Sequence, residues 1–354
     1  MGENKLLSWQ MTELNGELQF KENPLPEIND KEVIVKIAGC GVCHTDLSFW
    51  HYGVKTKHPL PLTLGHEISG TVIAGPENWM NKNVIIPAVL PCGECDLCRN
   101  GRGNICQNQL MPGNDFDGGF ASHIKVPFKF LCPVPDSVLK THSLEQLAVI
   151  ADAVTTPYQV IKKSGLKTDD FAVVIGVGGV GIYAALITKI LGAKVLAIDV
   201  DDQKLQIAQE NGVDAVLNVK DLDIKATKSA VRGIAKDLGA LPYMWKIYEM
   251  SGTKPGQEMA FSLLTFASTL SIVGFTMDKL EVRLSNLMAF DAQLIGTWGC
   301  KPELYPEVVN LVGTGKLKIE NFVETFPLSK INEVFKNTLE HKYKKRSVMV
   351  PDFN

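Results

Sequence analysis

Four cysteines are spaced closely enough to bind one metal ion. Cys92, Cys95, Cys98 and Cys106 have two, two and seven residues between successive members. Such spacing lets one loop place four thiolates around Zn²⁺, which takes a tetrahedral shell at about 2.3 Å from each sulfur. Because four cysteines fill that shell and leave no position for a substrate, we expect a structural zinc holding a lobe at about residues 91–107. Two disulfides or four unrelated thiols are the alternatives, and a chain without an export signal disfavours them.

A second set of metal-binding side chains is dispersed along the chain. Cys43 lies in GCGVCHTDLSFW, and His66 and Glu67 lie in TLGHEISG. Asp152, in ADAVTTPY, is a further candidate because a carboxylate among small and apolar residues needs a partner. A helix N-cap is the alternative role for Asp152, and the residues alone do not separate the two roles. A catalytic zinc keeps one position open for water or substrate, so these residues predict the zinc that does chemistry. The remaining cysteines, expected in the core, are Cys40, Cys132 and Cys300.

A glycine-rich segment has the spacing of a dinucleotide site. GVGGVG places Gly176, Gly178 and Gly181 as GxGxxG, after a buried apolar run and before a helical pattern. In that context the first glycine permits a tight turn, the second admits the pyrophosphate, and the third lets helix and strand pack closely. The helix N-terminus then offers free N–H groups to the phosphates. The alternative is a simple glycine-rich turn.

An acidic residue follows the glycines at the distance expected for a ribose ligand. Asp199 comes 18 residues after Gly181, at the end of the next predicted strand. Its carboxylate would accept bonds from both adenosine ribose hydroxyls. Asp199, Asp201 and Asp202 would together repel a 2′-phosphate, so the sequence predicts NAD rather than NADP. We also assign to the cofactor site Gly179, Val180 and Lys204.

The elements around these residues change character along the chain. Residues 1–150 are β-rich, with short apolar runs broken by Gly and Pro turns. From about residue 165, predicted strands alternate with predicted helices. The strands are FAVVIGVG, KVLAIDV, AVLNV, KIYEMSG and STLSIVGF, and the helices include GVGIYAALITKILG and DDQKLQIAQENG. This alternation predicts an α/β region with a doubly wound parallel sheet.

Length and charge exclude several classes of protein. The chain has 354 residues, enough for about two domains. Its net charge of −3 disfavours a nucleic-acid groove or a polybasic membrane anchor, so we expect neither partner. No apolar run approaches the ~18–20 residues that cross a bilayer. The N-terminal MGENKLLSWQ lacks the pattern of a secretory signal, so a cytoplasmic protein is expected.

The order of these motifs resembles one family. CHTD at residues 43–46, GHE, the four-cysteine lobe and GVGGVG follow one another as in the zinc-dependent medium-chain alcohol dehydrogenases. The resemblance covers essentially the whole chain. It implies a GroES-like catalytic domain at 1–155, an inserted Rossmann NAD-binding domain at 156–295, and a C-terminal return to the catalytic domain at 296–354. It also implies a homo-oligomer, either a dimer or a tetramer.

The resemblance also implies roles for single residues. Cys43, His66 and Asp152 would bind the catalytic zinc, with Glu67 as an exchangeable ligand. Thr45 would hydrogen-bond the alcohol, while His44 and Arg346 would lie near the cofactor pyrophosphate. Three positions depart from the common pattern: Asp152, where many members have Cys; Ser48, where many have His; and Gly75, which comes one residue early.

The departure at Ser48 affects the proton relay. The segment DLSFWHYG is expected to begin a helical turn, and His51 follows Ser48 by three residues. Residues at that spacing share a helix face, so His51 could accept the proton passed on from Thr45. The alternative is that His51 lines a substrate channel or faces solvent.

Several longer stretches resemble one branch of the family. They include YGVKTKHPLPLTLGHEISG, MPGNDFDGGFASH, ADAVTTPYQ, GFTMDKLEVRLSNLMAF and GTWGC. That branch oxidises the ring hydroxyl of a cyclic acyl-CoA during anaerobic aromatic degradation, with NAD taking the hydride. Lys55, Lys57 and His58 are candidates to bind the CoA phosphates, or they form a solvated basic loop. Dehydrogenation of another free alcohol or polyol, and a non-catalytic homologue, are the alternatives.

Overall fold

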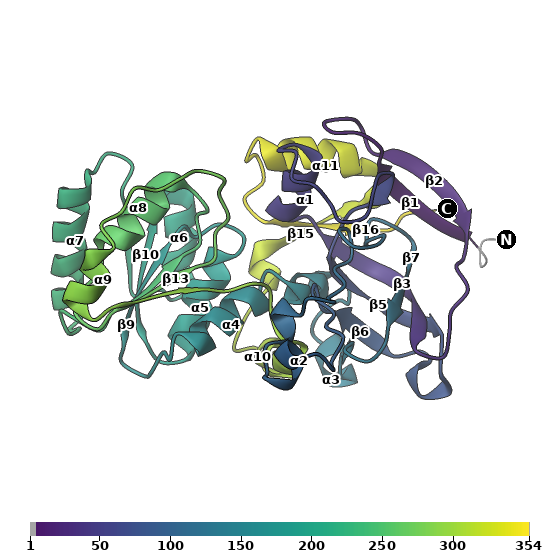
Figure 1. Cartoon of the computed structure of the whole chain (residues 1–354), viewed down its shortest axis with the longest axis horizontal. Coiled ribbons are helices and arrows are strands. Elements are labelled where there is room, and N and C mark those ends of the chain that lie inside the picture. Colours follow the sequence, from purple (N-terminus) through teal and green to yellow (C-terminus); the bar gives the residue numbers. More distant parts are fainter. Residues whose placement is uncertain (1–4, 354) are drawn as a thin grey trace. The chain divides into compact units, whose positions relative to one another are not determined.

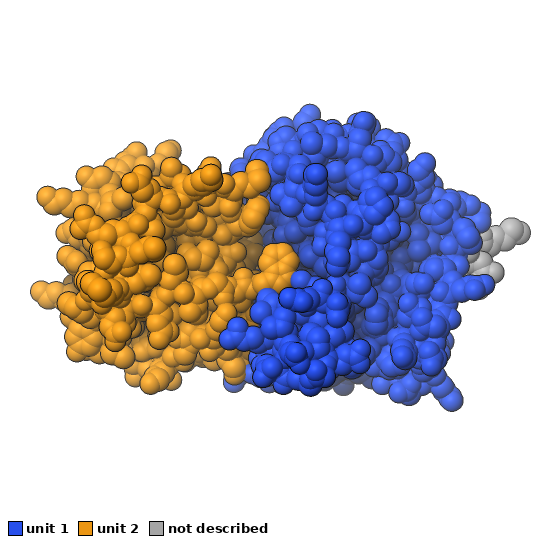
Figure 2. Space-filling model, in the orientation of Figure 1, with its two compact units in different colours: residues 1–155, 299–354 blue, residues 156–298 orange. Residues whose placement is uncertain are grey.

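The computed structural model describes residues 5–353, so the first four residues of the segment used for the export prediction lie outside it. The chain forms two compact units, one of residues 1–155 and 299–354 and the other of residues 156–298 (Figure 2). Residues 296–298, which the family resemblance assigned to the C-terminal return, lie in the second unit. None of the helices within residues 5–353 is long and apolar enough to span a membrane.

The second unit is built on a six-stranded parallel sheet (Figure 1). Its strand order is β11-β10-β9-β12-β13-β14. The strands are β9 (Phe171–Ile175), β10 (Lys194–Asp199), β11 (Ala215–Asn218), β12 (Lys246–Glu249), β13 (Thr269–Ile272) and β14 (Gln293–Gly296). The helices are α4 (Thr155–Lys163), α5 (Gly181–Ile190), α6 (Asp202–Glu210), α7 (Ile224–Asp237), α8 (Lys254–Ser262) and α9 (Ser285–Phe290). The predicted doubly wound sheet is confirmed.

The centre of this sheet is where a ligand is expected. The apolar residues of β9 are all buried, as a strand covered on both faces requires. The chain leaves β9 through α5 toward β10 on one side, and later places β12 on the other side. In open α/β sheets, ligands bind outside the carboxyl ends of strands at such a switch point. The GxGxxG segment lies there, directly after β9.

The first unit is mainly antiparallel β-structure. A three-stranded sheet has the order β2-β1-β4, and a seven-stranded sheet has the order β15-β16-β3-β5-β6-β8, with β7 also on β3. The strands are β1 (Lys5–Met11), β2 (Gln19–Pro24), β3 (Glu32–Gly41), β4 (Leu62–Thr63), β5 (Glu67–Ala74), β6 (Asn83–Ile86), β7 (His123–Pro127), β8 (Cys132–Pro133), β15 (Val323–Pro327) and β16 (Arg346–Val350). Together with the parallel sheet, this arrangement confirms the predicted fold class.

Short helices connect and flank these strands. The α-helices of this unit are α1 (His44–Trp50), α2 (Asp96–Arg99), α3 (Asp136–Leu139), α10 (Tyr305–Gly313) and α11 (Ile331–Leu339). The 3₁₀ turns are η1 (Glu77–Trp79), η2 (Gly103–Ile105), η3 (Gln146–Ala151), η4 (Pro302–Leu304), η5 (Glu320–Phe322) and η6 (Leu328–Lys330). The buried cysteines without ligand-like spacing, Cys40, Cys132 and Cys300, contribute to the interior as expected.

The C-terminal segment completes the first unit. Strand β16 pairs antiparallel with β3, with Val348 opposite Gly41 and Met349 opposite Cys40. This pairing brings the last residues of the chain beside the end of β3, immediately before Cys43. Residues far apart in the sequence therefore meet around the dispersed ligand set.

Candidate functional site

The four spaced cysteines form one cluster. Sulfur–sulfur distances are 3.9 Å for Cys92–Cys98, 3.5 Å for Cys95–Cys98, 3.6 Å for Cys95–Cys106 and 3.5 Å for Cys92–Cys106. A tetrahedron with about 2.3 Å from zinc to each sulfur requires sulfur atoms about 3.8 Å apart. Hydrogen bonds from the backbone N–H groups of Glu94 and Cys95 lower the pKa of Cys92 to about 6, which favours the thiolate that a metal needs. The cluster therefore fits a closed, structural zinc site.

The dispersed set also converges. One ligand atom from each of Cys43, His66, Glu67 and Asp152 lies within 4.8 Å of the others. Asp152 Oδ2 is 3.9 Å from Cys43 Sγ and 3.6 Å from His66 Nε2. His66 is 1% exposed, and its Nε2 has no hydrogen-bond partner among residues 5–353. A buried ring nitrogen without such a partner, facing a thiol and a carboxylate, fits a metal ligand.

Each ligand stands at the end of a regular element. Cys43 is the N-cap of α1, His66 directly precedes β5, and Asp152 is the C-cap of η3. The helix after Asp152, α4, begins only at Thr155. Of the two roles that the sequence left open for Asp152, its position favours the metal ligand over the helix N-cap.

Asp46 anchors two of the ligands, a role that the sequence analysis did not assign. It is 0% exposed, and its carboxylate accepts hydrogen bonds from the backbone N–H of Cys43 at 2.9 Å and of Gly65 at 3.1 Å. His66 Nδ1 lies 3.2 Å from the same carboxylate. Such a carboxylate fixes the ring orientation and leaves Nε2 for the metal. The only sequence signal was an acid three residues after Cys43, in a first helical turn.

The surroundings of His66 favour its protonated form when no metal is bound. Burial alone lowers the pKa of His66, but the charges of Asp46 and Cys43 outweigh this effect and raise the pKa well above its usual value. A metal ion would replace that proton and satisfy the same negative groups.

Glu67 and Arg346 form a buried ion pair. Arg346 Nε donates to Glu67 Oε2 at 3.1 Å, and Arg346 Nη2 donates to Glu67 Oε1. Glu67 is 0% and Arg346 is 7% exposed. Burial raises the pKa of Glu67, and the charge of Arg346 opposes that shift. The resemblance implied that Arg346 lies near a pyrophosphate; the structure turns its guanidinium toward Glu67.

The residues predicted to handle protons lie in and after α1. Thr45 Oγ1 is 3.7 Å from Cys43 Sγ, so this hydroxyl borders the open metal site. Ser48 Oγ donates to the backbone oxygen of His44 at 2.9 Å. His51 is the C-cap of α1, and its Nδ1 is bonded to Asn15 Oδ1. His44 is exposed, and its ring stacks on His341 at a centroid distance of 5.9 Å.

The glycine-rich loop of the second unit has the geometry of a phosphate-binding turn. Gly176 has φ +84°, and a Cβ there would come within 2.7 Å of the Ser251 backbone. A Cβ on Gly181 would lie 1.7 Å from the Gly176 carbonyl oxygen. A Cβ on Gly178 would meet nothing within 4 Å, so this position faces open space where a pyrophosphate can approach.

Asp199 is held at the end of β10 by three backbone N–H groups. Its Oδ2 accepts from Val177 at 2.9 Å, and its Oδ1 accepts from Val200 at 2.8 Å and from Asp201 at 3.1 Å. A carboxylate oxygen accepts more than one hydrogen bond, so both oxygens retain capacity for a ribose diol. The loop and Asp199 together fit the adenosine half of a dinucleotide.

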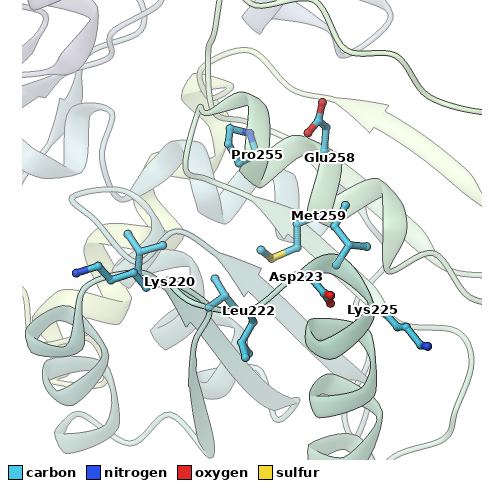
Figure 3. Close-up of a pocket in the computed structure, with 10 residues that line it drawn as sticks. Lys220, Leu222, Asp223, Lys225, Pro255, Glu258 and Met259 are labelled. Carbon is cyan, nitrogen blue, oxygen red and sulfur yellow. The ribbon is translucent and has the colours of Figure 1, made fainter.

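A pocket of about 690 Å³ is lined in part by Val200, the residue after Asp199, and the sequence analysis did not identify it. Val200 and Val219, which directly follow β10 and β11, help to line it, and Figure 3 draws the lining residues as sticks. It is lined by Val200, Val219, Lys220, Leu222, Asp223, Ile224, Lys225, Pro255, Glu258 and Met259. Lys204, predicted for the cofactor, is not among the lining residues; its backbone N–H is bonded to Asp201 in the first turn of α6.

Comparisons with known proteins agree with this geometry. Residues 29–136 match the alcohol dehydrogenase GroES-like domain, and residues 179–314 match the zinc-binding dehydrogenase family. An alcohol dehydrogenase of Geobacillus stearothermophilus is 31% identical over 95% of this chain and 96% of its own. D-arabinose 1-dehydrogenase (NADP⁺) of Saccharolobus solfataricus is 30% identical over 94% of both chains. The crystal structure of the alcohol dehydrogenase from Aeropyrum pernix superposes with a TM-score of 0.85 at 27% identity, covering 98% of this chain and 100% of that one.

The chain therefore belongs to the zinc-dependent medium-chain alcohol dehydrogenase family. It is an oxidoreductase of the zinc-type alcohol and polyol dehydrogenases, as the sequence predicted.

Proposed function

We propose that this enzyme oxidises the ring hydroxyl of 6-hydroxycyclohex-1-ene-1-carbonyl-CoA to the 6-oxo compound, with NAD as the hydride acceptor. The observation that carries the chemistry is the buried His66 Nε2, which has no hydrogen-bond partner within the described part of the chain and lies 3.6 Å from Asp152 Oδ2. The choice of substrate rests on the long stretches that resemble 6-hydroxycyclohex-1-ene-1-carbonyl-CoA dehydrogenase, an enzyme of anaerobic benzoyl-CoA degradation. The relatives are named as an alcohol dehydrogenase and a D-arabinose 1-dehydrogenase, so another alcohol or polyol is the second candidate substrate.

The chain's own residues would bind and orient the reactants. When bound, zinc supplies Lewis acidity toward an alcohol oxygen, and NAD supplies the carbon that accepts hydride. The metal would be bound by Cys43, His66 and Asp152. Glu67 lies beside these ligands and forms an ion pair with Arg346. Thr45, at the border of this set, would accept the hydroxyl proton of the substrate. A non-catalytic homologue would not require this open ligand set.

NAD rather than NADP is proposed as the cofactor because of the charge around the ribose site. Asp199 is fixed by three backbone N–H groups and cannot turn away without breaking them. Asp201 and Asp202 follow it at the start of α6. A 2′-phosphate would face these carboxylates, and the like charges would repel each other, which costs binding energy. The name of the Saccharolobus relative specifies NADP⁺, so the preference belongs to this chain's residues and not to the family.

The proton leaves Thr45 toward Ser48 and His51 in our proposal. Both follow Thr45 on one helical segment, and His51 keeps Nε2 for a water because Asn15 takes Nδ1. His51→Gln tests this route. If His51 accepts the proton, the pH profile of hydride transfer in His51→Gln loses its acid limb, and the variant still binds both zinc ions. An unchanged profile would show that Thr45 passes the proton directly to water.

The CoA phosphates require cations, and the basic loop supplies three exposed candidates, two of which already have a partner. Lys57 Nζ forms an ion pair with Asp115 at 2.8 Å, and His58 Nδ1 is bonded to the Pro59 carbonyl. Lys55 is exposed and belongs to the same loop. Of the three predicted residues, we propose Lys55 as the main phosphate contact. Lys55→Gln should raise the KM for the CoA ester and leave the KM of a free alcohol unchanged.

A second copy of the chain is the proposed protein partner. β14 is an edge strand of the parallel sheet, and open edges pair readily with another chain. Large apolar side chains near it are exposed, including Phe266 at 64%, Met288 at 80% and Leu294 at 45%. We propose that two copies pair through this edge, and the family resemblance allows a tetramer built from such dimers. Leu294→Lys should reduce the molar mass measured by light scattering.

The substrate proposal is tested by NADH formation with purified holoenzyme. We expect a higher kcat/KM for 6-hydroxycyclohex-1-ene-1-carbonyl-CoA than for cyclohex-2-en-1-ol, which has a related ring and no CoA, because the CoA phosphates add charge-assisted contacts such as the one proposed for Lys55. A higher value for free alcohols or polyols would reject the CoA substrate and keep the family activity. NADH from neither class would reject both.

A further inference from the structure

Asp152 is held differently from the other ligands of the open metal site. Cys43 and His66 share Asp46, which lies within the same stretch of chain. Asp152 comes from a separate segment, at the C-cap of η3, with φ −144° and ψ −57°. A short side chain such as Asp has little freedom, so the direction of its carboxylate follows the backbone that carries it. The backbone at Ala151 and Asp152 therefore decides where this ligand points.

One buried tyrosine fixes that backbone. Tyr305, the first residue of α10, is 0% exposed, and its hydroxyl donates to the carbonyl oxygen of Ala151. The same hydroxyl accepts from the backbone N–H of Ala88 at 3.3 Å. The Ala88 N–H also donates directly to the Ala151 carbonyl oxygen, at 3.4 Å. The Tyr305 hydroxyl lies 2.5 Å from this oxygen, so it is the nearer of the two partners. Burial raises the pKa of Tyr305 well above its usual value, which favours the protonated hydroxyl.

The peptide group concerned is the one that joins Ala151 to Asp152. Because that group is planar, fixing the Ala151 carbonyl also fixes the N–H of Asp152 and the start of its side chain. Asp152 Oδ2 then lies 3.6 Å from His66 Nε2 and 3.9 Å from Cys43 Sγ, where a shared metal ion would sit.

We propose that Tyr305 is a positioning residue of the open metal site, which holds Asp152 in ligand geometry through the Ala151 carbonyl. The inference rests on the proposed zinc chemistry and adds a residue to it. Tyr305 and Arg346 both come from residues 299–354. Both carboxylates of the site are thus held by the C-terminal return, since Arg346 binds Glu67. Cys43 and His66 are held by the N-terminal part of the chain.

The test compares two buried tyrosines whose hydroxyl groups form hydrogen bonds with different partners. Tyr305→Phe removes the hydrogen bond to Ala151 and keeps the ring. Tyr248→Phe is the matched control, because Tyr248 is also 0% exposed and its hydroxyl bonds Ser164 Oγ at 2.7 Å in the other unit. Thermal unfolding of both variants checks that each remains folded.

Zinc release from holoenzyme to a chromogenic chelator is the readout. A phase that remains in His66→Ala identifies the four-cysteine site. Partners that orient metal ligands are worth about 10–100-fold in metal affinity, so we expect Tyr305→Phe to release the open-site zinc about tenfold faster or more. The four-cysteine phase should not change, and Tyr248→Phe should match wild type in both phases.

A second readout is the visible spectrum of Co²⁺ placed in the open site, which reports ligand geometry independently of turnover. Tyr305→Phe should shift these bands, and Tyr248→Phe should not. Wild-type release rates with an unchanged cobalt spectrum would overturn the proposal, as would equal acceleration of both zinc phases. A wild-type protein with a single zinc phase would instead reject the proposed function.

Discussion

The ion pair between Arg346 and Glu67 is the most consequential buried interaction at the metal site, and its removal gives a prediction with a definite size. Arg346→Leu leaves the Glu67 carboxylate 0% exposed and without its cation. Removing one partner of a buried pair costs about 3–5 kcal/mol, because the remaining charge stays desolvated. Adding Glu67→Leu should recover most of that loss, since a well-packed apolar pair often matches a buried ion pair.

The effect is best measured locally, because two units need not unfold together. Amide hydrogen exchange of peptides from β5 and β16 reports the stability around Glu67 and Arg346. A loss of about 3–5 kcal/mol accelerates exchange of the slowest amides by about 100- to 4,000-fold in Arg346→Leu.

A surface pair provides the matched control. Lys5 and Glu22 form an ion pair at 2.6 Å, but their side chains are 54% and 50% exposed. Lys5→Gln should therefore cost at most about 1 kcal/mol, or about fivefold in exchange. Two results would contradict this prediction. Arg346→Leu could change the exchange rates no more than the control does, or the double variant with Glu67→Leu could lose as much stability as the two single variants lose together.

Three further predictions concern the two metal sites, the cofactor site and the buried Glu249 at the end of β12. Cys92→Ser should lose one zinc and much stability, while His66→Ala should lose the other zinc and turnover but keep the fold; a single zinc in fully active wild type contradicts both. Asp199→Ala should weaken NADH binding, measured by fluorescence titration, and reduce the difference in affinity between NADH and NADPH. Equal use of both cofactors by wild type would refute the assignment. Burial raises the pKa of Glu249, whose carboxylate accepts from Ser251 and Gly252, so the folded state favours its protonated form. Stability of wild type relative to Glu249→Gln should rise as pH is lowered from neutrality through that raised pKa, and a pH-independent difference would contradict this.

The sequence predicted the features that short segments encode. The four cysteines of the lobe lie within one loop, so their spacing alone specifies a tetrahedral cluster. The strand, glycine turn and helix at Gly176–Gly181 are also local, and the acid at the end of the next strand is only one element away. Each of these predictions depended on residues whose relative positions are set by a single turn or a single βαβ unit.

The interactions that sequence analysis missed join distant segments. Arg346 and Glu67 are 279 positions apart, and Tyr305 and Ala151 are 154 apart. Their meeting depends on the pairing of β16 with β3 and on the packing of α10, which no local pattern specifies. Asp46 was overlooked for a related reason, because its ligand-orienting role appears only when His66 folds against it.

The central proposal is that an alcohol held at the Cys43, His66 and Asp152 site would pass its carbinol hydride directly to NAD. The most direct measurement is deuterium transfer from 6-hydroxycyclohex-1-ene-1-carbonyl-CoA and cyclohex-2-en-1-ol, each labelled at the carbinol carbon, followed by mass spectrometry of the NADH formed. We predict labelled NADH from at least one of them with wild type and none with His66→Ala. Unlabelled NADH, or transfer that persists in His66→Ala, would contradict the account.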